Sequence, residues 1–289
     1  MRSILSCLLL GGLLLGSRAA QAQYDPNVAH RSVQPLELWP ELQGELAFAN
    51  GDYLLLALRG QRSTYDYSSA VKRPLGFDTR RATVAYEHFW NPHWSWGGTL
   101  RYESAANFET NSYGDLLVPE LLLRHRSPIF GGLTFGQRLG VERQILVNRH
   151  VVGSSGADGQ FWGRLRVDVE RLFFFNGDIM GFALRPRLSY AASTHLRFQK
   201  DVSDPDERTI QFTSLRGEVG LRLSPRIDVT PWFAYQTNYQ QSLVFTDVNG
   251  NPVSGGKTNY VYPTLGLDLR FTLLPVAPGA NRRQLPTQH

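Results

Sequence analysis

Two side chains with the chemistry of a hydrolase lie two residues apart near the middle of the chain. His125 and Ser127, in the run His125-Arg126-Ser127, are a potential general base and nucleophile, and their spacing places them on one side of a β-strand. A hydrolase also needs a third residue that orients the imidazole. The neighbouring residues 133–135 are Leu, Thr and Phe, with no Asn, Asp or Glu facing the pair. We therefore interpret the pair as an interfacial histidine and a serine that begins a turn, with hydrolysis as the alternative.

A second set of reactive side chains consists of arginines and carboxylates that alternate with apolar residues. From Arg164 to Glu170 every second residue is charged, and the residues between them are apolar. Because successive side chains of a strand point to opposite faces, the charged residues share one face. The same alternation recurs in other segments, and if such strands close into a barrel, their charged faces line its lumen. We call this lumen-facing set the charge ladder; it consists of Glu87, Arg101, Glu103, Arg138, Glu142, Arg164, Arg166, Asp168, Glu170, Arg185, Arg187, Arg216, Glu218, Arg222, Asp268 and Arg270.

Two hypotheses account for the charge ladder. It forms an electrostatic filter along a substrate path, or its arginines pair with carboxylates across strands and fill a narrow interior. We favour the second hypothesis, because the width of a barrel grows with its strand number and the strands here number about twelve.

The remaining polar residues indicate neither a metal nor a cofactor. The seven histidines lack the spacing of a metal site. Four acidic residues lie between Asp201 and Glu207, but they lack the glycine that fixes the turn of a calcium-binding loop. We therefore interpret them as part of a solvated loop. The glycines of 132–140 lie within a strand pattern and do not form a phosphate-binding loop. We assign no catalytic, cofactor-binding or metal-binding residue.

The elements that position all these residues are β-strands. In residues 260–273 the odd positions from Leu265 onward are apolar and the even positions are mainly polar or small, which is the period of a two-faced strand. The same pattern recurs along the chain. Strands are expected at 38–48, 53–66, 79–90, 94–106, 115–127, 131–148, 160–173, 179–199, 209–223, 227–245 and 258–273.

The connections between these strands are alternately short and long. Short turns such as Asn50-Gly51-Asp52 alternate with longer polar loops at 67–78, 107–114, 149–159, 200–208 and 246–257. A charge on the lipid face at mid-bilayer costs about 2–4 kcal/mol, so the charged faces must point inward. The pattern predicts an all-β fold, an antiparallel transmembrane β-barrel of about twelve strands with short periplasmic turns and longer outer loops.

Closure of the barrel and its aromatic girdles give two further expectations. Eleven strands are counted, whereas bacterial single-chain barrels close with an even number. We expect residues 24–37 to supply an ascending first strand, which makes twelve. Aromatic residues are expected in two interfacial belts, and the belt beside the short turns includes Trp94, Trp96 and Trp232.

The two ends of the chain are expected to form a signal peptide and a tail. Residues 1–22 have Arg2, an apolar run and Ala20-Gln21-Ala22, which predict a secretory signal peptide cleaved before Gln23. Residues 23–37 are a linker or a weak first strand, 38–273 the barrel, and 274–289 a disordered tail. Cleavage removes Cys7 and two arginines, which lowers the formal net charge from +5 to +3. That charge is too small to favour nucleic acid as a partner.

Two resemblances add to these expectations. Runs such as ELWPELQGEL (37–46), RHRSPIFGGLTFGQRLGVERQ (124–144) and FWGRLRVDVERLF (161–173) resemble an uncharacterised family of bacterial outer-membrane β-barrels, catalogued as a domain of unknown function. This resemblance implies a barrel in a Gram-negative outer membrane and no activity. The H-x-S run resembles that of outer-membrane phospholipases and lipid A deacylases. Here, however, Pro128 and Ile129 replace the Asn-Gly of the phospholipases, and the pair lies at the periplasmic end.

Together these patterns favour a non-enzymatic outer-membrane protein with a structural or passive narrow-pore role. Its expected partners are outer-membrane lipid and the barrel-assembly machinery, and it is expected to be a monomer. The alternative hypothesis is an outer-membrane lipid hydrolase that uses His125 and Ser127.

Overall fold

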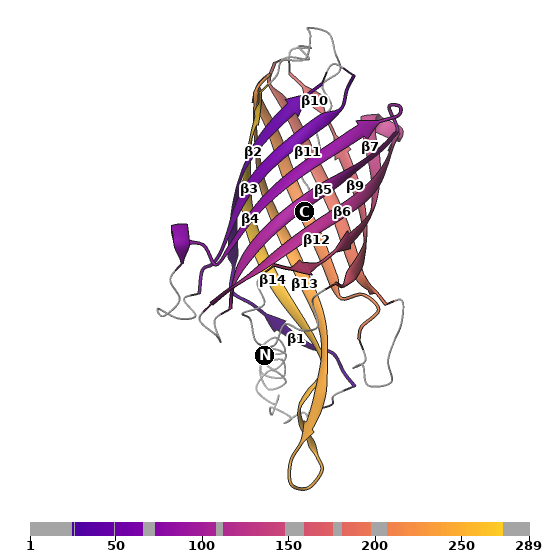
Figure 1. Ribbon diagram of the computed structural model, residues 1–289. Helices are drawn as coiled ribbons and strands as arrows, with labels where there is room; N and C mark the ends of the chain where they lie inside the picture. Colours follow the sequence, from indigo (N-terminus) through magenta and orange to yellow (C-terminus); the bar gives the residue numbers. More distant parts are fainter. Residues whose placement is uncertain are drawn as a thin grey trace, which may run out of the picture.

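The protein folds into a single closed β-barrel in the computed structural model, which describes residues 25, 27–48, 50–65, 73–107, 112–147, 159–175, 181–197 and 207–273. Within these ranges, eleven strands form the barrel wall (Figure 1). They are β2 (Glu37–Ala47), β3 (Tyr53–Ser63), β4 (Thr79–Phe89), β5 (Trp94–Asn107), β6 (Ser112–Pro128), β7 (Leu133–Arg143), β9 (Phe161–Arg171), β11 (Ala183–Leu196), β12 (Phe212–Ser224), β13 (Ile227–Thr246) and β14 (Pro252–Thr272). The all-β barrel expected from the sequence is confirmed.

Five small elements lie outside this ring. Three are the short strands β1 (His30–Val33), β8 (Ile145–Leu146) and β10 (Phe173–Phe174), and two are the 3-10 turns η1 (Pro74–Gly76) and η2 (Phe130–Gly132). In the described ranges no helix has the length and apolar character needed to span a bilayer. The predicted signal peptide and the predicted C-terminal tail lie outside the described residues.

The barrel closes through one parallel pair of strands. β14 pairs in parallel with β2 over nine residues, from Thr264 opposite Glu37 to Thr272 opposite Glu45. All other neighbouring wall strands are antiparallel, so an odd number of strands requires one parallel contact. The ascending strand expected in residues 24–37 is not formed by the part of this range that the structure describes, 25 and 27–37. Instead β1 lies parallel to β14 beside Thr258–Val261, just before β2 on the same edge.

The two rims of the barrel differ in their connections. The turns β2–β3, β4–β5, β6–β7 and β12–β13 are short and lie at the upper rim in Figure 1, which we call the short-turn rim. The opposite end is the long-loop rim, and most of its loops fall outside the described residues. Gly131 and Gly132 have φ values of 67° and 74° in the β6–β7 turn, a conformation that favours glycine.

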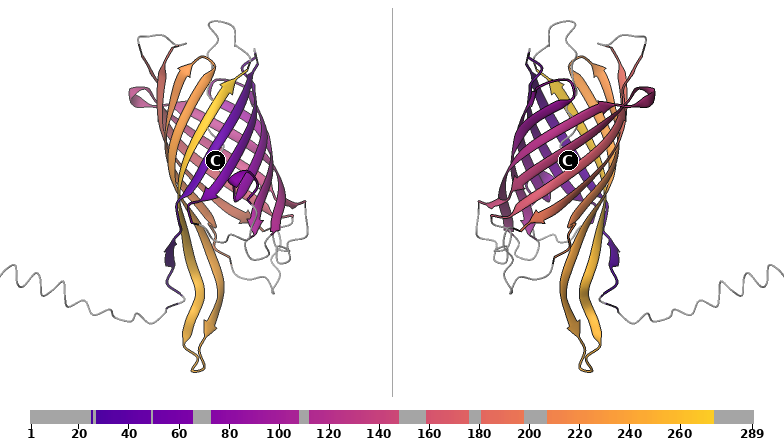
Figure 2. Two further views of the ribbon diagram at one scale, coloured as in Figure 1. Left: turned by 90° about the vertical axis from the view of Figure 1, so that its left-hand side faces the viewer. Right: turned by 90° about the vertical axis from the view of Figure 1, so that its right-hand side faces the viewer.

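One connection at the long-loop rim differs from the prediction. Residues 246–257 were expected to form a loop, but β13 and β14 remain paired there, with Ser242 opposite Gly256 and Phe245 opposite Ser254. The hairpin projects beyond the barrel wall in both views of Figure 2. It turns through Asp247, which accepts hydrogen bonds from the backbone N–H groups of Asn249 and Asn251, both at 2.8 Å. Local turn hydrogen bonds therefore make a hairpin, with two register shifts near Phe245, from a segment whose glycines and asparagines indicated a loop.

The strands present an apolar face outward and a polar face inward. On β12, Leu215 and Val219 are exposed, whereas Arg216, Glu218 and Arg222 are buried. A soluble barrel would place these two sets the other way round, because burial of charges is costly. The exposed apolar side chains recur on every wall strand that the structure describes, which produces an apolar band around the outside.

One aromatic residue contradicts the predicted belts. Trp94 and Trp96 lie on the outer face, but Trp232 is buried inside the barrel. Its position has the same parity as Asp228 and Ala234, which also point inward. Gly266 lies opposite Trp232 on β14, and a Cβ at Gly266 would be 2.0 Å from the indole ring. The glycine therefore provides the space that lets a tryptophan fit within the wall's inner layer.

Candidate functional site

The residues of the predicted charge ladder gather inside the barrel. Thirteen of the sixteen are buried, and Arg101, Glu103 and Arg164 are half-buried. They come from β4, β5, β7, β9, β11, β12 and β14, and each occupies an inward position of its strand. Their side chains therefore face one another across a narrow interior, where each charge requires an opposite charge, a hydrogen bond or water.

Some interior ion pairs, such as Arg187–Glu218, join residues directly opposite each other, but those around β6 and β7 run diagonally or skip a strand. Across β6 and β7, Glu120 lies directly opposite Glu142, and Arg124 directly opposite Arg138. Because like charges repel when they are directly opposite, the partners must be sought elsewhere. Arg138 Nη2 donates to both carboxylate oxygens of Glu120 at 2.8 and 2.9 Å. Arg101 Nη2 lies 3.5 Å from Glu142 Oε2, on the far side of β6. The tight curvature of the wall makes this contact possible.

A second group of ion pairs links β12 to β11 and, across β13, to β14. Arg216 donates to Glu218 at 2.8 Å and to Asp268 at 3.0 Å, and Arg187 lies 2.6 Å from Glu218. Arg216 also stacks on Trp232, with its guanidinium carbon 3.9 Å from the ring centroid. A single arginine thus satisfies two carboxylates and one aromatic face, which immobilises the centre of the interior.

The interior is filled unequally along its length. Towards the short-turn rim, three ion pairs have at most 6% of each side-chain surface exposed: Arg124–Glu87, Arg187–Glu218 and Arg270–Glu45. Arg126, at the rim itself, keeps 20% exposed. Towards the long-loop rim, Arg81, Arg101 and Arg164 keep 14–20% of their side-chain surface exposed. The short-turn half is therefore a packed network of ion pairs, and the long-loop half is more open.

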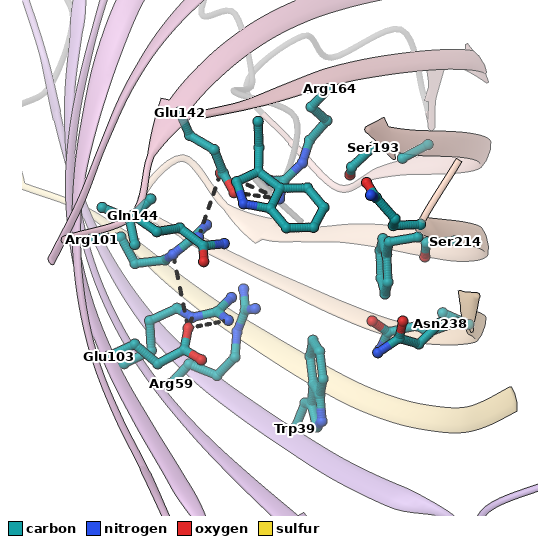
Figure 3. Close-up of a pocket in the computed structure, with 18 of the residues that line it drawn as sticks. Trp39, Arg59, Arg101, Glu103, Glu142, Gln144, Arg164, Ser193, Ser214 and Asn238 are labelled. Atoms are coloured by element: carbon teal, nitrogen blue, oxygen red, sulfur yellow. Dashed lines mark hydrogen bonds and ion pairs between the residues drawn. The ribbon is translucent and has the colours of Figure 1, made fainter. Parts of the chain in front are cut away.

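A cavity of about 350 Å³ occupies the long-loop half of the interior. Figure 3 shows Arg59, Arg101, Glu103 and Glu142 on one side of it, and Ser193, Ser214 and Asn238 on the other. One side is thus rich in charge, and the other carries neutral hydroxyl and amide groups.

Two tryptophans close the inner end of the cavity. Trp39 and Trp232 meet edge to face, with ring centroids 5.8 Å apart and planes at 85°. Each indole N–H has an acidic acceptor: Trp39 Nε1 donates to Glu37 at 2.9 Å, and Trp232 Nε1 donates to Asp268 at 2.8 Å. These hydrogen bonds hold both rings in place at the boundary between the cavity and the ion-pair network.

The interior contains charged residues that the predicted ladder omitted. Arg81 donates to Glu103 at 2.8 and 2.5 Å, and Asp228 lies 3.6 Å from Arg222. Arg81 has the same parity as Glu87 on the same strand, so strand alternation could have found it. Arg126 forms an ion pair with Glu170; it lies between His125 and Ser127 and therefore points to the opposite face.

The structure brings His125 and Ser127 within hydrogen-bonding distance. Ser127 Oγ lies 3.4 Å from His125 Nε2 on the outer face, close to the short-turn rim. The His125 ring packs against Trp94, with centroids 4.4 Å apart. Gln137 lies directly opposite His125 in the strand register, a residue that the inspection of 133–135 missed. No hydrogen bond between the imidazole and an acid or amide side chain occurs among the described residues.

Within the described ranges, no group of three or more His, Cys, Asp or Glu side chains is arranged to hold a metal ion. The acidic segment 201–206 lies outside the described residues.

Neither a scan of protein-family models nor a search of curated proteins finds a match to this chain.

Proposed function

We propose that the protein is a β-barrel of the bacterial outer membrane with a narrow interior and a passive, non-catalytic role. The carrying observation is the inversion of the usual polarity: leucines and valines cover the outside of the wall, and ion-paired arginines and carboxylates fill the inside. A lipid bilayer is the solvent that stabilises this inverted arrangement, because it accepts the apolar band and leaves no backbone edge unpaired in a closed barrel.

The rims support one orientation in the membrane. Outer-membrane barrels have short periplasmic turns and longer outer loops, so the short-turn rim faces the periplasm. Outer-membrane lipid contacts the apolar band, and the barrel-assembly machinery inserts the chain. A monomer satisfies this arrangement, and the small net charge gives no reason to add nucleic acid as a partner. A folded barrel migrates faster on an SDS gel before boiling than after it, so gel mobility tests the barrel fold. Recovery of the protein in the outer-membrane fraction of the cell tests its location.

The packed short-turn half supports a narrow passage. Ion pairs with almost no exposed surface leave little room there for water, whereas wide porins keep a water-filled channel with about sixteen to eighteen strands. We expect small or undetectable conductance when the refolded protein is inserted into a planar lipid bilayer. Replacement of Arg164, Arg166, Arg216 and Arg222 by Ser removes paired side chains from the interior and is expected to raise conductance, with some loss of stability.

The conductance experiment has a clear contrary result. Large, steady wild-type channels would show that the paired residues act as a filter around an open path, and the narrow-passage proposal would then be abandoned.

Hydrolysis of a lipid ester is the second candidate function, because Ser127 Oγ lies 3.4 Å from His125 Nε2 on the outward face. In this reaction Ser127 attacks the ester carbonyl while His125 takes its proton, the alcohol leaves with that proton, and water releases the acid. The assay is phospholipid hydrolysis in mixed micelles by the wild type, Ser127→Ala and the neighbouring control Thr134→Ala. Activity lost only in Ser127→Ala would establish this function, and an inactive wild type would exclude it.

A further inference from the structure

The cavity in the long-loop half has an imbalance of charge. Three arginines, Arg81, Arg101 and Arg164, share two carboxylates, Glu103 and Glu142. Glu103 is engaged closely by Arg81, at 2.5 and 2.8 Å. Glu142 lies between the other two arginines, 3.5 Å from Arg101 and 3.3 Å from Arg164. This cluster has one more cation than it has anions.

The two arginines that share Glu142 line the cavity. Each guanidinium has five N–H groups in a fixed fork. Arg101 Nε lies 3.9 Å from Glu103, beyond hydrogen-bonding distance, and has no other hydrogen-bond acceptor among the described residues. The exposed surface of Arg101 and Arg164 opens into the cavity, which both residues line. An anionic group placed between Arg101 and Arg164 would neutralise the surplus positive charge and accept hydrogen bonds from their N–H groups.

The other cavity residues suit a body that carries hydroxyl groups. Ser193 is 5% exposed and lines the cavity, and its Oγ has no hydrogen-bond partner among the described residues. Trp162 Nε1, also in the lining, is likewise buried without a partner there. Buried polar groups are normally satisfied, so the Ser193 hydroxyl and the Trp162 indole N–H are available to a polar occupant of the cavity. The rings of Trp39 and Trp232 add flat apolar surface at the inner end.

We propose that this cavity binds a small organic anion with a hydroxylated ring, such as a sugar acid of monosaccharide size. Its carboxylate is held by Arg101 and Arg164, its hydroxyl groups face Ser193 and the neutral side, and its ring packs near the tryptophans. The volume of about 350 Å³ lies at the lower end of the range for ligand pockets, about 300–1,000 Å³, which limits the occupant to a small molecule. The site does not depend on whether the barrel conducts ions, and so goes beyond the function proposed above.

The test uses the refolded protein in detergent micelles and the fluorescence of its tryptophans, three of which line the cavity. The probes are glucuronate, neutral glucose and inorganic phosphate. Glucuronate is expected to change the fluorescence along a saturable curve, and the other two to bind at least about tenfold more weakly, because each lacks either the charge or the hydroxylated ring. No saturation with glucuronate overturns the proposal. Equal binding of phosphate overturns the ring part and leaves a general anion site.

Variants locate the binding. Arg101→Gln is expected to weaken glucuronate binding by about tenfold or more, since it removes a charged hydrogen bond. The control is Arg126→Gln: Arg126 has 20% of its side-chain surface exposed, against 14% for Arg101, but it pairs with Glu170 and does not line the cavity. Ser214→Phe fills the cavity without a change of charge and is expected to abolish binding. Gel mobility before boiling checks the folding of each variant. Unchanged binding in Arg101→Gln and Ser214→Phe, or equal loss in the control, refutes the site.

Discussion

A charge placed on the outer face of β14 should destabilise the barrel in a membrane. Leu267 is 49% exposed and lies in the middle of the wall, opposite Pro231 on β13 and Pro40 on β2. Arginine at the bilayer midplane costs about 2–4 kcal/mol. Since each 1.4 kcal/mol changes an equilibrium constant tenfold, Leu267→Arg is expected to lower the folding equilibrium constant in lipid by about 30- to 700-fold.

The control must place arginine on the inner face where there is space. Thr264 is an inward residue of the same strand, but it is fully buried and its Oγ1 accepts a hydrogen bond from Gln236 at 2.8 Å. Arginine there would overpack the interior. Ser214 lines the cavity on its neutral side, with uncharged Ala191 and Gln236 opposite it in the register, so Ser214→Arg has room and solvent for the longer side chain. It adds a cation to a cavity that has a surplus of them, so we expect a small loss of stability that stays well below the cost of a charge facing lipid.

Urea titration in lipid vesicles measures the effect. Each variant is equilibrated with vesicles, and the folded fraction is read from its faster gel migration before boiling. The expected order of stability is wild type, then Ser214→Arg slightly below it, then Leu267→Arg far below. Equal midpoints for Leu267→Arg and Ser214→Arg would refute the assignment of the outer face to lipid.

Three further predictions concern the rims and the chain terminus. An epitope inserted between Asn249 and Gly250, at the tip of the projecting hairpin, should be labelled on intact cells. Labelling only after permeabilisation would show that the long-loop rim faces the periplasm. At the short-turn rim, burial would raise the pKa of Asp52, but hydrogen bonds from Tyr86, His88, the Phe89 N–H and Asn50 lower it overall. Asp52→Asn should therefore cost about 1–3 kcal/mol of stability in urea titrations at pH 7. Because the folded pKa is depressed, this contribution is present above the unfolded pKa of about 3.9 and is lost as the pH falls through the folded pKa, so a gap that persists at lower pH would contradict the assignment. N-terminal sequencing of the membrane fraction should begin at Gln23, and recovery of Met1 would disprove cleavage.

Strand alternation predicted most of the wall, because the apolar and charged residues within each strand indicate which of its faces is buried. The expected strand at 94–106 and the observed β5, Trp94–Asn107, agree to within one residue. The inward direction of Arg166 or Glu218 follows in the same way from apolar residues beside it. Such information is local, so it can be read without knowledge of the partner strands.

Features that depend on contacts between distant segments could not be predicted. The parallel pairing of β2 with β14 joins residues more than two hundred positions apart, and no local pattern encodes its direction. The parity of Trp232 with Asp228 gives its inward direction, but the space for its ring depends on Gly266 of the neighbouring strand, which no local pattern shows. The cavity is also a product of assembly, since Arg101, Glu142 and Arg164 come from three separate strands.

The parallel closure places the two ends of the barrel chain on opposite sides. β2 starts at Glu37 on the long-loop rim, and β14 ends at Thr272 on the short-turn rim, with nine paired residues, about 30 Å of strand, between the levels of these ends. A barrel with an even number of strands has both ends at one rim, so a short linker can join them into a circular chain. Here a circular permutant would need a linker that crosses the full height of the wall. In the proposed orientation, tags fused before β2 and after β14 would report from the cell surface and the periplasm respectively.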